Sequence, residues 1–499
     1  MGTTSVWRGT VAPSSWPALT EDLTTDVLVV GGGITGVTTA WLIAQAGVPV
    51  VLLEAHELGG GDTGNSTGNL YETVSGGLDA LTRKWDADTA RAVVASRREA
   101  IAFIEQRAGE LGEASGFRRC PMHVYAGSPD AAEQVQAEAQ AVREAGIAAH
   151  LADAVPEGPP PAQGPVLVME QQAQFHPMGY VQALAASAAE RGARIFERSA
   201  VLSLDLPQRC AQTARGKVTA REIVLATHSP IGFHLMQAGM VPRREYGLAA
   251  PLGERAFPAG IFWALGQQRL SVRALDAPAG RFLVCVGQDH KTGQHDAPAA
   301  MRELEAAAQR RLGVQQVAYR WSAQNFQSPD GLPYIGTDPS GAHVATGFAT
   351  DGLVYGTLAA QLLADQLLDR DNRWRELYKA TRFTPVKSAK VFGEETAAVV
   401  KAVVQDYLTD RQREQLGRLA PGNAAIADLD GERVAAYRAH DGKLFAVSPV
   451  CTHLKCIVHW NPVETSWDCP CHGSRFAPDG RVLEGPAIEP LRAKLVSEE

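Results

Sequence analysis

Residues 26–54, DVLVVGGGITGVTTAWLIAQAGVPVVLLE, set the strongest limit on the fold of this chain. An apolar run, a glycine-rich turn, a run of helical spacing and a second apolar run ending in an acid predict a βαβ unit. Gly31, Gly33 and Gly36 form the pattern G-x-G-x-x-G. The first glycine makes the tight turn, the second admits a pyrophosphate, and the third lets helix and strand pack closely. The segment therefore predicts a Rossmann-type domain that binds a dinucleotide.

Glu54 ends the second predicted strand, 18 residues beyond Gly36. A carboxylate there can accept the ribose hydroxyls of a dinucleotide and would repel an added 2′-phosphate. The phosphates are expected at the helix N-terminus, beside Ile34 and Thr35. The same glycine pattern recurs at residues 59–64, where it lacks both strand and acid and indicates a plain loop. The fingerprint alone leaves NAD and FAD open.

Two distant regions carry a resemblance to a known group of flavoproteins. REIVLATHSP predicts a strand that ends at Ala226 and Thr227, and HVATGFATDGLVYGTLAAQLLADQLL predicts a strand, a glycine-rich bend and a long helix. Over residues 25–370 this layout resembles the FAD-dependent amino-acid and amine oxidoreductases, the group of D-amino-acid oxidase, glycine oxidase and sarcosine oxidase. The resemblance implies FAD as the cofactor.

The same resemblance implies where FAD would lie. The glycine turn would hold the pyrophosphate, the loop after Glu54 would lie near the flavin, and a strand near Val201 would touch the adenine. The bend at residues 347–353 would present a helix N-terminus to the flavin ring, where N–H groups can stabilise negative charge. The residues expected at FAD are Gly31, Gly33, Ile34, Thr35, Gly36, Glu54, Thr63, Gly64, Ser66, Thr67, Val201, Ala226, Thr227, Gly347, Asp351, Gly352 and Leu353.

Three residues are candidates for the substrate side of the flavin. Residues 243–292 are expected to form a second, mixed sheet that covers the ring. Within it, Arg273 is a candidate for holding a carboxylate bidentately, and His290 for acting as a base. Tyr355, just after the glycine bend, is a third candidate. A surface arginine and a hydrogen-bonded structural histidine remain the alternative interpretations.

The segment CTHLKCIVHWNPVETSWDCPCHGS, residues 451–474, holds four of the seven cysteines and three of the thirteen histidines. Cys451 and His453 form C-x-H, and after fifteen intervening residues Cys469 and His472 form C-x-x-H. A Rieske [2Fe–2S] cluster has two cysteines on one iron and two histidines on the other, so each loop would supply one of each. A tetrahedral zinc site is the alternative, but zinc ligands usually come as separate cysteine and histidine pairs.

This segment resembles the disulfide-containing Rieske proteins of cytochrome bc complexes. The resemblance implies a disulfide between Cys456 and Cys471 and a hydrogen bond from Ser474 to a bridging sulfide. Phe476 stands where those proteins have a tyrosine that bonds a cysteine sulfur, so we expect a less oxidising cluster. Lys455 replaces their usual glycine, which leaves the loop conformation open.

The whole chain is expected to form an α/β Rossmann-type FAD domain with an inserted mixed-sheet α+β substrate domain, followed by a small all-β Rieske domain. It is similar to a bacterial family of flavin oxidoreductases with a C-terminal Rieske domain. The expected boundaries are 1–380 for the FAD-dependent oxidoreductase (nucleotide-binding parts about 25–80, 170–235 and 325–370; substrate-domain parts about 81–165 and 240–320), 381–407 for a linker and helix, and 408–499 for the Rieske domain.

This pairing joins a two-electron carrier to a one-electron carrier. We expect an enzyme that oxidises the C–N bond of an amine or amino acid and passes electrons singly to the cluster. The alternatives are a flavin monooxygenase or reductase fed through the cluster, and a non-enzymatic electron-transfer or redox-sensing protein. A Rieske oxygenase would need a 2-His-1-carboxylate iron site, and a ferredoxin reductase a second nucleotide-binding turn. The sequence contains neither pattern.

Charge and hydropathy restrict the partners. A formal net charge of -8 does not suit a nucleic-acid partner. No run approaches the roughly 20 apolar residues of a membrane span, and the N-terminal residues lack a charged leader with an apolar core. We expect a cytoplasmic protein with a small-molecule substrate, an electron-transfer protein as its redox partner, and no nucleic acid or membrane. A disulfide would be unusual in that compartment.

Overall fold

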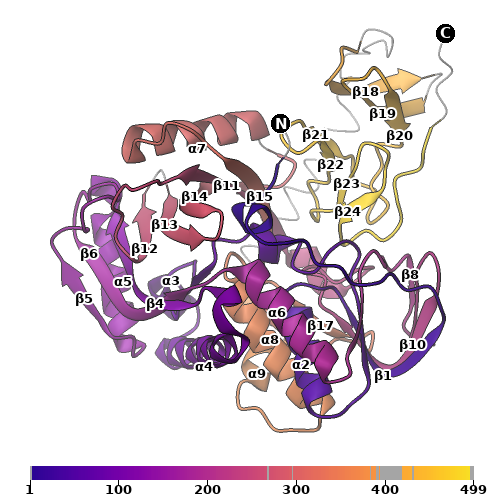
Figure 1. The fold of residues 1–499 in the computed structure, drawn as a ribbon, viewed down its shortest axis with the longest axis horizontal. Coiled ribbons are helices and arrows are strands. Elements are labelled where there is room, and N and C mark those ends of the chain that lie inside the picture. Colours follow the sequence, from indigo (N-terminus) through magenta and orange to yellow (C-terminus); the bar gives the residue numbers. More distant parts are fainter. Residues whose placement is uncertain are drawn as a thin grey trace.

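The computed structural model of the protein describes residues 3–266, 269–294, 296–382, 384–388, 393, 419–429 and 432–494. Two large sheets with their helices form the body, and two small sheets form the C-terminal part (Figure 1). Most of the expected linker and helix at 381–407, and the start of the expected Rieske domain, lie outside the described residues.

The first large sheet has eight strands in the described part of the chain. Its centre is parallel: β1 pairs with β2 and β10, β2 with β7, and β10 with β17. Parallel sheets are covered on both faces, and the last four residues of β1 and all four of β2 are buried accordingly. The strands are β1 (Leu23–Val30), β2 (Val50–Leu53), β7 (Arg194–Phe196), β8 (Ser203–Asp205), β9 (Cys210–Gln212), β10 (Lys217–Leu225), β16 (Tyr334–Thr337) and β17 (His343–Thr346).

The second large sheet has nine described strands. It is mixed, because β12 and β4 run parallel whereas the other neighbouring strands pair antiparallel. It runs in the order β15-β11-β14-β13-β12-β4-β6-β3, with β5 beside β6. Its strands are β3 (Asn69–Leu70), β4 (Arg118–Ala126), β5 (Ala149–Ala152), β6 (Val166–Gln174), β11 (Val241–Pro251), β12 (Ile261–Leu265), β13 (Leu270–Ala277), β14 (Gly280–Lys291) and β15 (Tyr319–Gln327).

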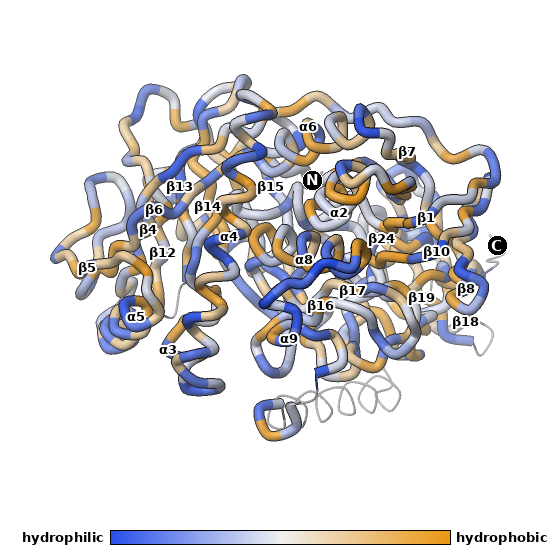
Figure 2. The backbone as a smooth tube through the Cα atoms, turned by 90° about the horizontal axis from the view of Figure 1, so that it is seen from below, coloured by the Kyte–Doolittle hydropathy of each residue, from blue (hydrophilic) through white to orange (hydrophobic). Residues whose placement is uncertain are grey.

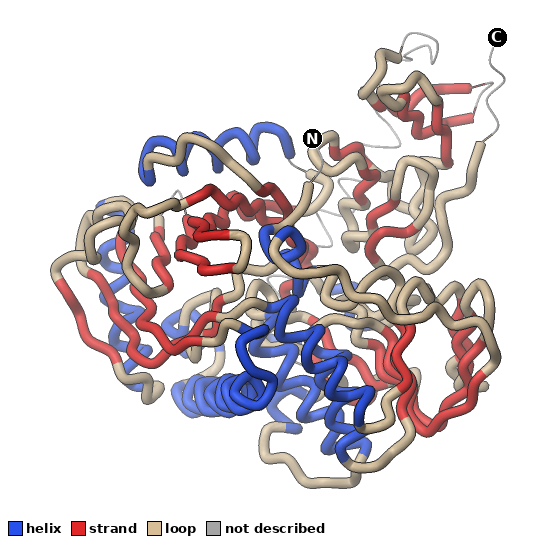
Figure 3. The backbone as a smooth tube through the Cα atoms, viewed as in Figure 1, coloured by secondary structure: helices blue, strands red, loops and turns tan. Residues whose placement is uncertain are grey.

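The helices join the two sheets into one body (Figure 3). α2 packs between α6 and α8, and α4 packs on α8 and α6. One apolar cluster contains Val29 of β1, Met122 of β4 and residues of all four helices, so the core runs from one sheet to the other. The helices are α1 (Val6–Gly9), α2 (Ile34–Gln45), α3 (Leu78–Lys84), α4 (Ala87–Leu111), α5 (Ala132–Glu144), α6 (Pro177–Glu190), α7 (Ala297–Leu312), α8 (Gly352–Leu367) and α9 (Arg375–Tyr378).

The helix α4 lies within the expected substrate-domain part, yet it packs beside the helices of the first sheet. Its buried side chains, including Val93, Ile101 and Ile104, belong to the cluster that also holds residues of α2 and α8.

Figure 2 shows apolar residues concentrated along α2 and α8, and most residues of both helices are buried. None of the described helices is both long and apolar enough to cross a membrane.

The C-terminal part consists of two small antiparallel sheets around a core that includes Val458, Trp467 and Phe476. The two loops rich in cysteine and histidine flank the second sheet, one before β21 and one between β22 and β23. The strands are β18 (Ala424–Leu429), β19 (Glu432–Arg438), β20 (Leu444–Val447), β21 (His459–Asn461), β22 (Ser466–Asp468), β23 (Arg475–Phe476) and β24 (Val482–Glu484).

Candidate cofactor and substrate sites

The glycine-rich turn joins β1 to α2 under tight steric limits. Gly31 has φ +108°, and a Cβ there would lie 2.4 Å from the carbonyl oxygen of Ala226. A Cβ on Gly36 would lie 1.9 Å from the carbonyl oxygen of Gly31. A Cβ on Gly33 would meet Thr63 Oγ1 at 3.2 Å and no other described atom within 4 Å. The turn is thus closed toward the sheet, and Thr63 is the one described neighbour above Gly33, at the helix end where a pyrophosphate would lie.

A short loop folds over the N-terminus of α2. Gly33 is the N-cap and brings no side chain to the helix end, while the Ile34 N–H donates to Thr63 Oγ1 at 3.0 Å. Ser66 Oγ donates to the Thr63 carbonyl at 2.8 Å, and the Gly64 carbonyl accepts from Ser5 Oγ. The structure therefore brings this part of the expected set together at one helix end, where the dipole favours an anion.

The remaining nucleotide candidates lie around the carboxyl end of the first sheet. The Glu54 carboxylate accepts the N–H groups of Gly32 at 2.7 Å and His56 at 2.8 Å. Burial raises the pKa of Glu54, although these two N–H groups oppose the shift. Thr227 Oγ1 donates to the Ser229 carbonyl at 2.8 Å. Val201 is half-buried in the loop before β8 and packs on the core of the first sheet.

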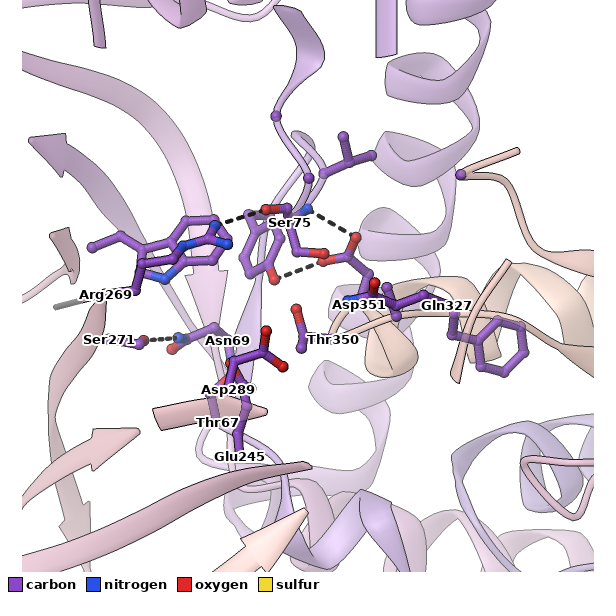
Figure 4. Close-up of a pocket in the computed structure, with 18 of the residues that line it drawn as sticks. Thr67, Asn69, Ser75, Glu245, Arg269, Ser271, Asp289, Gln327, Thr350 and Asp351 are labelled. Carbon is purple, nitrogen blue, oxygen red and sulfur yellow. Dashed lines mark hydrogen bonds between the residues drawn. The ribbon is translucent and has the colours of Figure 1, made fainter. Parts of the chain in front are cut away.

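A cavity of about 330 Å³ lies between the second sheet and the bend before α8. Figure 4 shows Asn69, Glu245 and Asp289 on the sheet side and Thr350 and Asp351 on the bend side. Of the residues expected near the flavin or the substrate, four line it: Thr67, Gly347, Asp351 and Tyr355.

The N-terminus of α8 faces this cavity without a side-chain cap. Its N-cap residue, Asp351, instead accepts the Tyr71 hydroxyl at 2.7 Å and the Ser75 N–H at 3.0 Å. A Cβ on Gly352 would meet Phe348 Cδ2 at 4.0 Å and no nearer described atom. The space beside the first residue of α8 is therefore open, and no described side chain caps the N–H groups of this helix end.

Arg97 is a fully buried cation beside Tyr71 and Tyr355, two residues that line the cavity. Its guanidinium donates to the carbonyls of Tyr71 and Glu72 and lies 4.4 Å from the ring centre of Tyr355. Burial raises the pKa of Tyr355 to about 12. The phenol therefore stays protonated near neutral pH.

Arg273 does not lie among the residues that line the cavity. Its guanidinium donates to the carbonyls of Gly68 at 2.6 Å, Thr67 at 3.3 Å and Phe175 at 3.4 Å. It also lies 5.3 Å from the ring of Trp7, and burial lowers its pKa to about 9. The structure thus gives Arg273 backbone carbonyls as hydrogen-bond partners.

His290 also lies outside the cavity lining, although its neighbour Asp289 lines it. The imidazole stacks on Tyr246 with ring centres 5.4 Å apart, and its Nδ1 lies 2.7 Å from the Gln288 carbonyl oxygen. The pairing of β11 with β14 shifts by one residue between Arg244 and Tyr246, and Gln288 on β14 has φ +63° there. This bulge interrupts the regular alternation of side chains between the two faces of the sheet. Because of this irregularity, the expected base points away from the cavity.

The cysteine and histidine loops converge in the C-terminal part. Cys456 and Cys471 form a disulfide, and Cys451 and Cys469 are free and buried. The sulfur atoms of Cys456, Cys469 and Cys471 lie within 4.8 Å of one another. Since two of these sulfurs are consumed in the disulfide, Cys451 and Cys469 remain as thiolate donors.

Three ring nitrogens of the histidines in these two loops have no hydrogen-bond partner among the described residues. The rings of His453 and His472 are 5.2 Å apart at 81°. Both ring nitrogens of His453, and Nδ1 of His472, are buried without a hydrogen bond in the described chain. Burial lowers the pKa of both, that of His472 to about 4, and so favours the neutral imidazoles. Buried neutral imidazoles without partners, beside two thiols, fit the donor set of a Rieske cluster.

Lys455 and Ser474 support these loops. Lys455 has φ +62°, a left-handed conformation that the glycine of bc-type Rieske proteins would adopt with less strain. Its N–H donates to the Cys451 carbonyl at 3.1 Å. Ser474 Oγ accepts the Ala487 N–H at 3.1 Å. The loop conformation left open by Lys455 is therefore the one that a glycine favours.

Hydrogen bonds tie the second cluster loop to the body of the protein. Gln324 of β15 donates from Nε2 to the Gly473 carbonyl at 2.9 Å, next to His472. Its backbone N–H donates to Asp62 Oδ1 at 2.7 Å, in the loop that covers α2. One residue thus bridges the two candidate cofactor sites.

A buried ion network forms the second connection. Arg244 of β11, with 1% of its side chain exposed, pairs with Glu464 at 2.8 Å and Glu484 at 3.5 Å. Arg475 pairs with the same two carboxylates and with Asp468 at 3.0 Å. Two arginines and three carboxylates therefore share one buried site at this contact.

Comparison with protein families decides the identity of the body. The profile described as FAD dependent oxidoreductase matches residues 26–366, more than half of the chain. The chain belongs to the FAD-dependent oxidoreductase family. A second profile, the Rieske [2Fe-2S] domain, matches residues 412–494 of this oxidoreductase.

Relatives of this FAD-dependent oxidoreductase share one or both parts. YhfW of Bacillus subtilis (strain 168), named as a Rieske 2Fe-2S iron-sulfur protein, is 31% identical over 97% of this chain and 96% of its own. Gamma-glutamylputrescine oxidoreductase of Escherichia coli (strain K12) is 28% identical over 43% of this chain and 51% of its own. The glycine oxidase structure from Geobacillus kaustophilus has a TM-score of 0.59 and 19% identity, over 72% of this chain and all of its own.

These findings confirm the predicted fold class and both predicted cofactors, FAD and a Rieske [2Fe–2S] cluster. The open cradle above Gly33 and the uncapped end of α8 fit FAD. The unpartnered nitrogens of His453 and His472 fit the cluster.

Sequence reasoning missed several residues of this FAD-dependent oxidoreductase. Tyr71, Glu245 and Asp289 line the cavity, and Arg97 lies behind it, but none belongs to a recognised motif. A signal did exist for one of them. In VPRREYGLAAP, three charged residues follow one another inside an otherwise largely apolar strand, and the third is Glu245.

Proposed function

We propose that this FAD-dependent oxidoreductase oxidises the carbon–nitrogen bond of a small amine or amino acid and passes the electrons one at a time to its Rieske cluster. Two of its relatives are named for nitrogen compounds, glycine and gamma-glutamylputrescine. FAD supplies a hydride acceptor that can also donate single electrons, and the cluster supplies a one-electron acceptor.

One observation carries this proposal: the strand β11 is shared by the cavity and the Rieske part. Glu245 of β11 lines the cavity, while the adjacent Arg244 pairs with Glu464 and Glu484 beyond the strand. On the neighbouring strand, Gln324 holds the carbonyl of Gly473, next to the ligand candidate His472. A single sheet thus separates the place where a substrate fits from the loops that fit the cluster.

The chain's own residues have distinct tasks in this proposal. The turn at Gly31, Gly33 and Gly36 holds the pyrophosphate, with Glu54 at the ribose. The bend at 347–353 directs the N–H groups of α8 toward the ring, where they favour negative charge. Cys451, His453, Cys469 and His472 ligate the cluster, and the Cys456–Cys471 disulfide ties their loops together.

The test is an anaerobic titration of the holoenzyme. D-amino acids, N-methyl amino acids and amines are added while flavin absorbance and the Rieske EPR signal are recorded together. We expect an effective substrate to bleach the flavin and then to raise the EPR signal. In Cys469→Ala the flavin should still bleach, because its site is separate, while no Rieske signal appears. Cys210→Ala, at a half-buried free cysteine of β9, is the matched control and should behave as wild type.

Three other outcomes would each contradict the proposed function. Flavin reduction by NADH, with no response to any amine, would replace this proposal with a reductase. Cluster reduction that precedes flavin reduction would reverse the direction of electron flow. Bleaching by none of these reductants would leave a non-catalytic redox protein.

A further inference from the structure

Glu245 is a carboxylate without a hydrogen-bond partner in the wall of the cavity. It projects from β11, is half-buried, and lines the cavity. Among the residues that the structure describes, none forms a hydrogen bond or an ion pair within 4.0 Å with its carboxylate, and Asp289, Arg269, Arg243 and Asp351 act on it through their charges alone. Its full capacity to accept hydrogen bonds is therefore available to a ligand.

The other carboxylates that line the cavity are already engaged. Arg243 holds Asp289 at 2.6 Å, and Arg382 holds Asp330 at 2.7 Å. Asp351 accepts from Tyr71 and from the Ser75 N–H. These contacts leave Glu245 as the unpaired carboxyl group among the described lining residues.

The basic groups of the cavity are directed at backbone carbonyls. Lys84 Nζ donates to the Pro329 carbonyl, and burial lowers its pKa. Arg269 donates to the Ser75 carbonyl at 3.0 Å, with its guanidinium 5.6 Å from the Trp263 ring. Neither cation forms an ion pair with Glu245 in the described chain.

The surroundings of Glu245 favour its neutral form in the absence of a ligand. Burial, followed by the charge of Asp289, raises the pKa of Glu245 to about 7. A cation placed beside the carboxylate would lower that pKa again. The charged and titratable groups that face Glu245 are Asp289, Arg243, Arg269, Asp351 and Tyr71.

We propose that Glu245 receives the substrate's nitrogen as an ammonium ion and takes its proton, so that the substrate class is a cationic primary or secondary amine. In this step the N–H bond of the ammonium breaks, an O–H bond forms on Glu245, and the electron pair stays on nitrogen. The free amine that results has the lone pair that oxidation of the adjacent carbon requires. This inference rests on the proposed function and adds to it the charge of the substrate and a catalytic residue.

The first test is the Glu245→Gln variant of the holoenzyme. It keeps the shape but cannot take a proton, so kcat/KM for ammonium substrates should fall roughly 100-fold or more. In the wild type, kcat/KM should rise with pH up to about 7, because the carboxyl must be ionised to act. Glu245→Gln should lose this rise, whereas Glu245→Asp should keep it. Glu190→Gln, at an exposed residue of α6, should match the wild type.

The second test measures binding without turnover. Tert-butylamine has no hydrogen on the carbon next to nitrogen, so it binds as an ammonium ion but cannot be oxidised. Calorimetry at pH 7 in two buffers should show release of about half a proton from the wild type, because about half of the Glu245 carboxyls carry a proton at pH 7 and must lose it to the buffer before they can receive an ammonium ion. Glu245→Gln should release none, with unchanged flavin and Rieske spectra as evidence of intact folding.

The outcomes separate this inference from the proposed function. Amine-driven bleaching that is equally fast in Glu245→Gln, or wild-type binding without proton release, would overturn the role of Glu245 and leave the proposed function intact. Proton-linked binding of tert-butylamine, with no bleaching by any amine, would support the ammonium site and overturn the proposed oxidation.

Discussion

Gly36 shows how strongly a single residue limits the nucleotide turn. A Cβ on this residue would lie 1.9 Å from the Gly31 carbonyl oxygen, which is far below any van der Waals contact. The backbone oxygen cannot move without displacing β1, because Gly31 also donates its N–H to the Leu53 carbonyl at 2.8 Å. Helix and strand can approach this closely only while the third glycine lacks a side chain.

We therefore expect Gly36→Ala to lose FAD and stability. Forced separation of α2 and β1 should cost about 1–3 kcal/mol. Thermal denaturation and the flavin absorbance per protein would measure both effects. Gly109→Ala in α4 is the control, because a Cβ there meets no described atom within 4 Å, and alanine should add about 0.5–1 kcal/mol. A Gly36→Ala protein with full FAD content would contradict this interpretation of the turn.

The sequence predicted those parts of the site in which the chemistry is local. The glycine turn and the cysteine and histidine loops each depend on a few neighbouring residues, so their spacing identifies them. Arg273 and His290 do not line the cavity, and the reasons are non-local. The guanidinium of Arg273 is held by carbonyls of Thr67 and Gly68, which lie far away in the chain, and His290 follows an irregular stretch of β14.

At the scale of the element, β11 carries two adjacent charges to opposite sides. Successive side chains of a strand point to opposite faces, so Arg244 and Glu245 are separated although they are neighbours in sequence. Arg244 lies in the buried ion network, and Glu245 lines the cavity. The strand thus predicts two separable defects from two neighbouring substitutions.

Arg244→Met should weaken the attachment of the Rieske part while sparing the cavity. Removing one cation from a buried network leaves Glu464 and Glu484 under-compensated, at a cost of about 3–5 kcal/mol. Rapid-mixing experiments should show normal flavin bleaching by substrate but slower growth of the Rieske EPR signal. Arg221→Met, at an exposed pair with Asp26, should change neither rate. If Arg244→Met slowed bleaching as strongly as cluster reduction, the two faces of β11 would not act independently.

At the scale of the whole molecule, the two parts have separate cores but shared contacts. The Rieske part has its own apolar cluster around Val458, Trp467 and Phe476. Gln324 and the Arg244 network connect it to the oxidoreductase body. Sequence patterns predicted both parts, because each has its own motif, but not these contacts, which join side chains from unrelated segments.

This arrangement predicts that losing the cluster blocks turnover and not the first half-reaction. His453→Ala removes one proposed iron ligand, so a single anaerobic addition of substrate should still bleach the flavin at the wild-type rate. Steady-state turnover with ferricytochrome c as acceptor should fall by more than about tenfold, since one-electron exit would depend on the cluster. His150→Ala, at an exposed histidine, is the control. Unchanged turnover would mean that electrons leave the flavin by another route.

Because β11 lies between the cavity and the Rieske part, the electron donor and the final electron acceptor would bind at separate places on the protein. If electrons cross this sheet as proposed, the final oxidant would not need to resemble the amine or to enter the cavity. The two reactants should then show no mutual competition at any concentration. Substitutions on the outer surface of the Rieske part could then change which oxidant is used without changing the cavity that Glu245 lines.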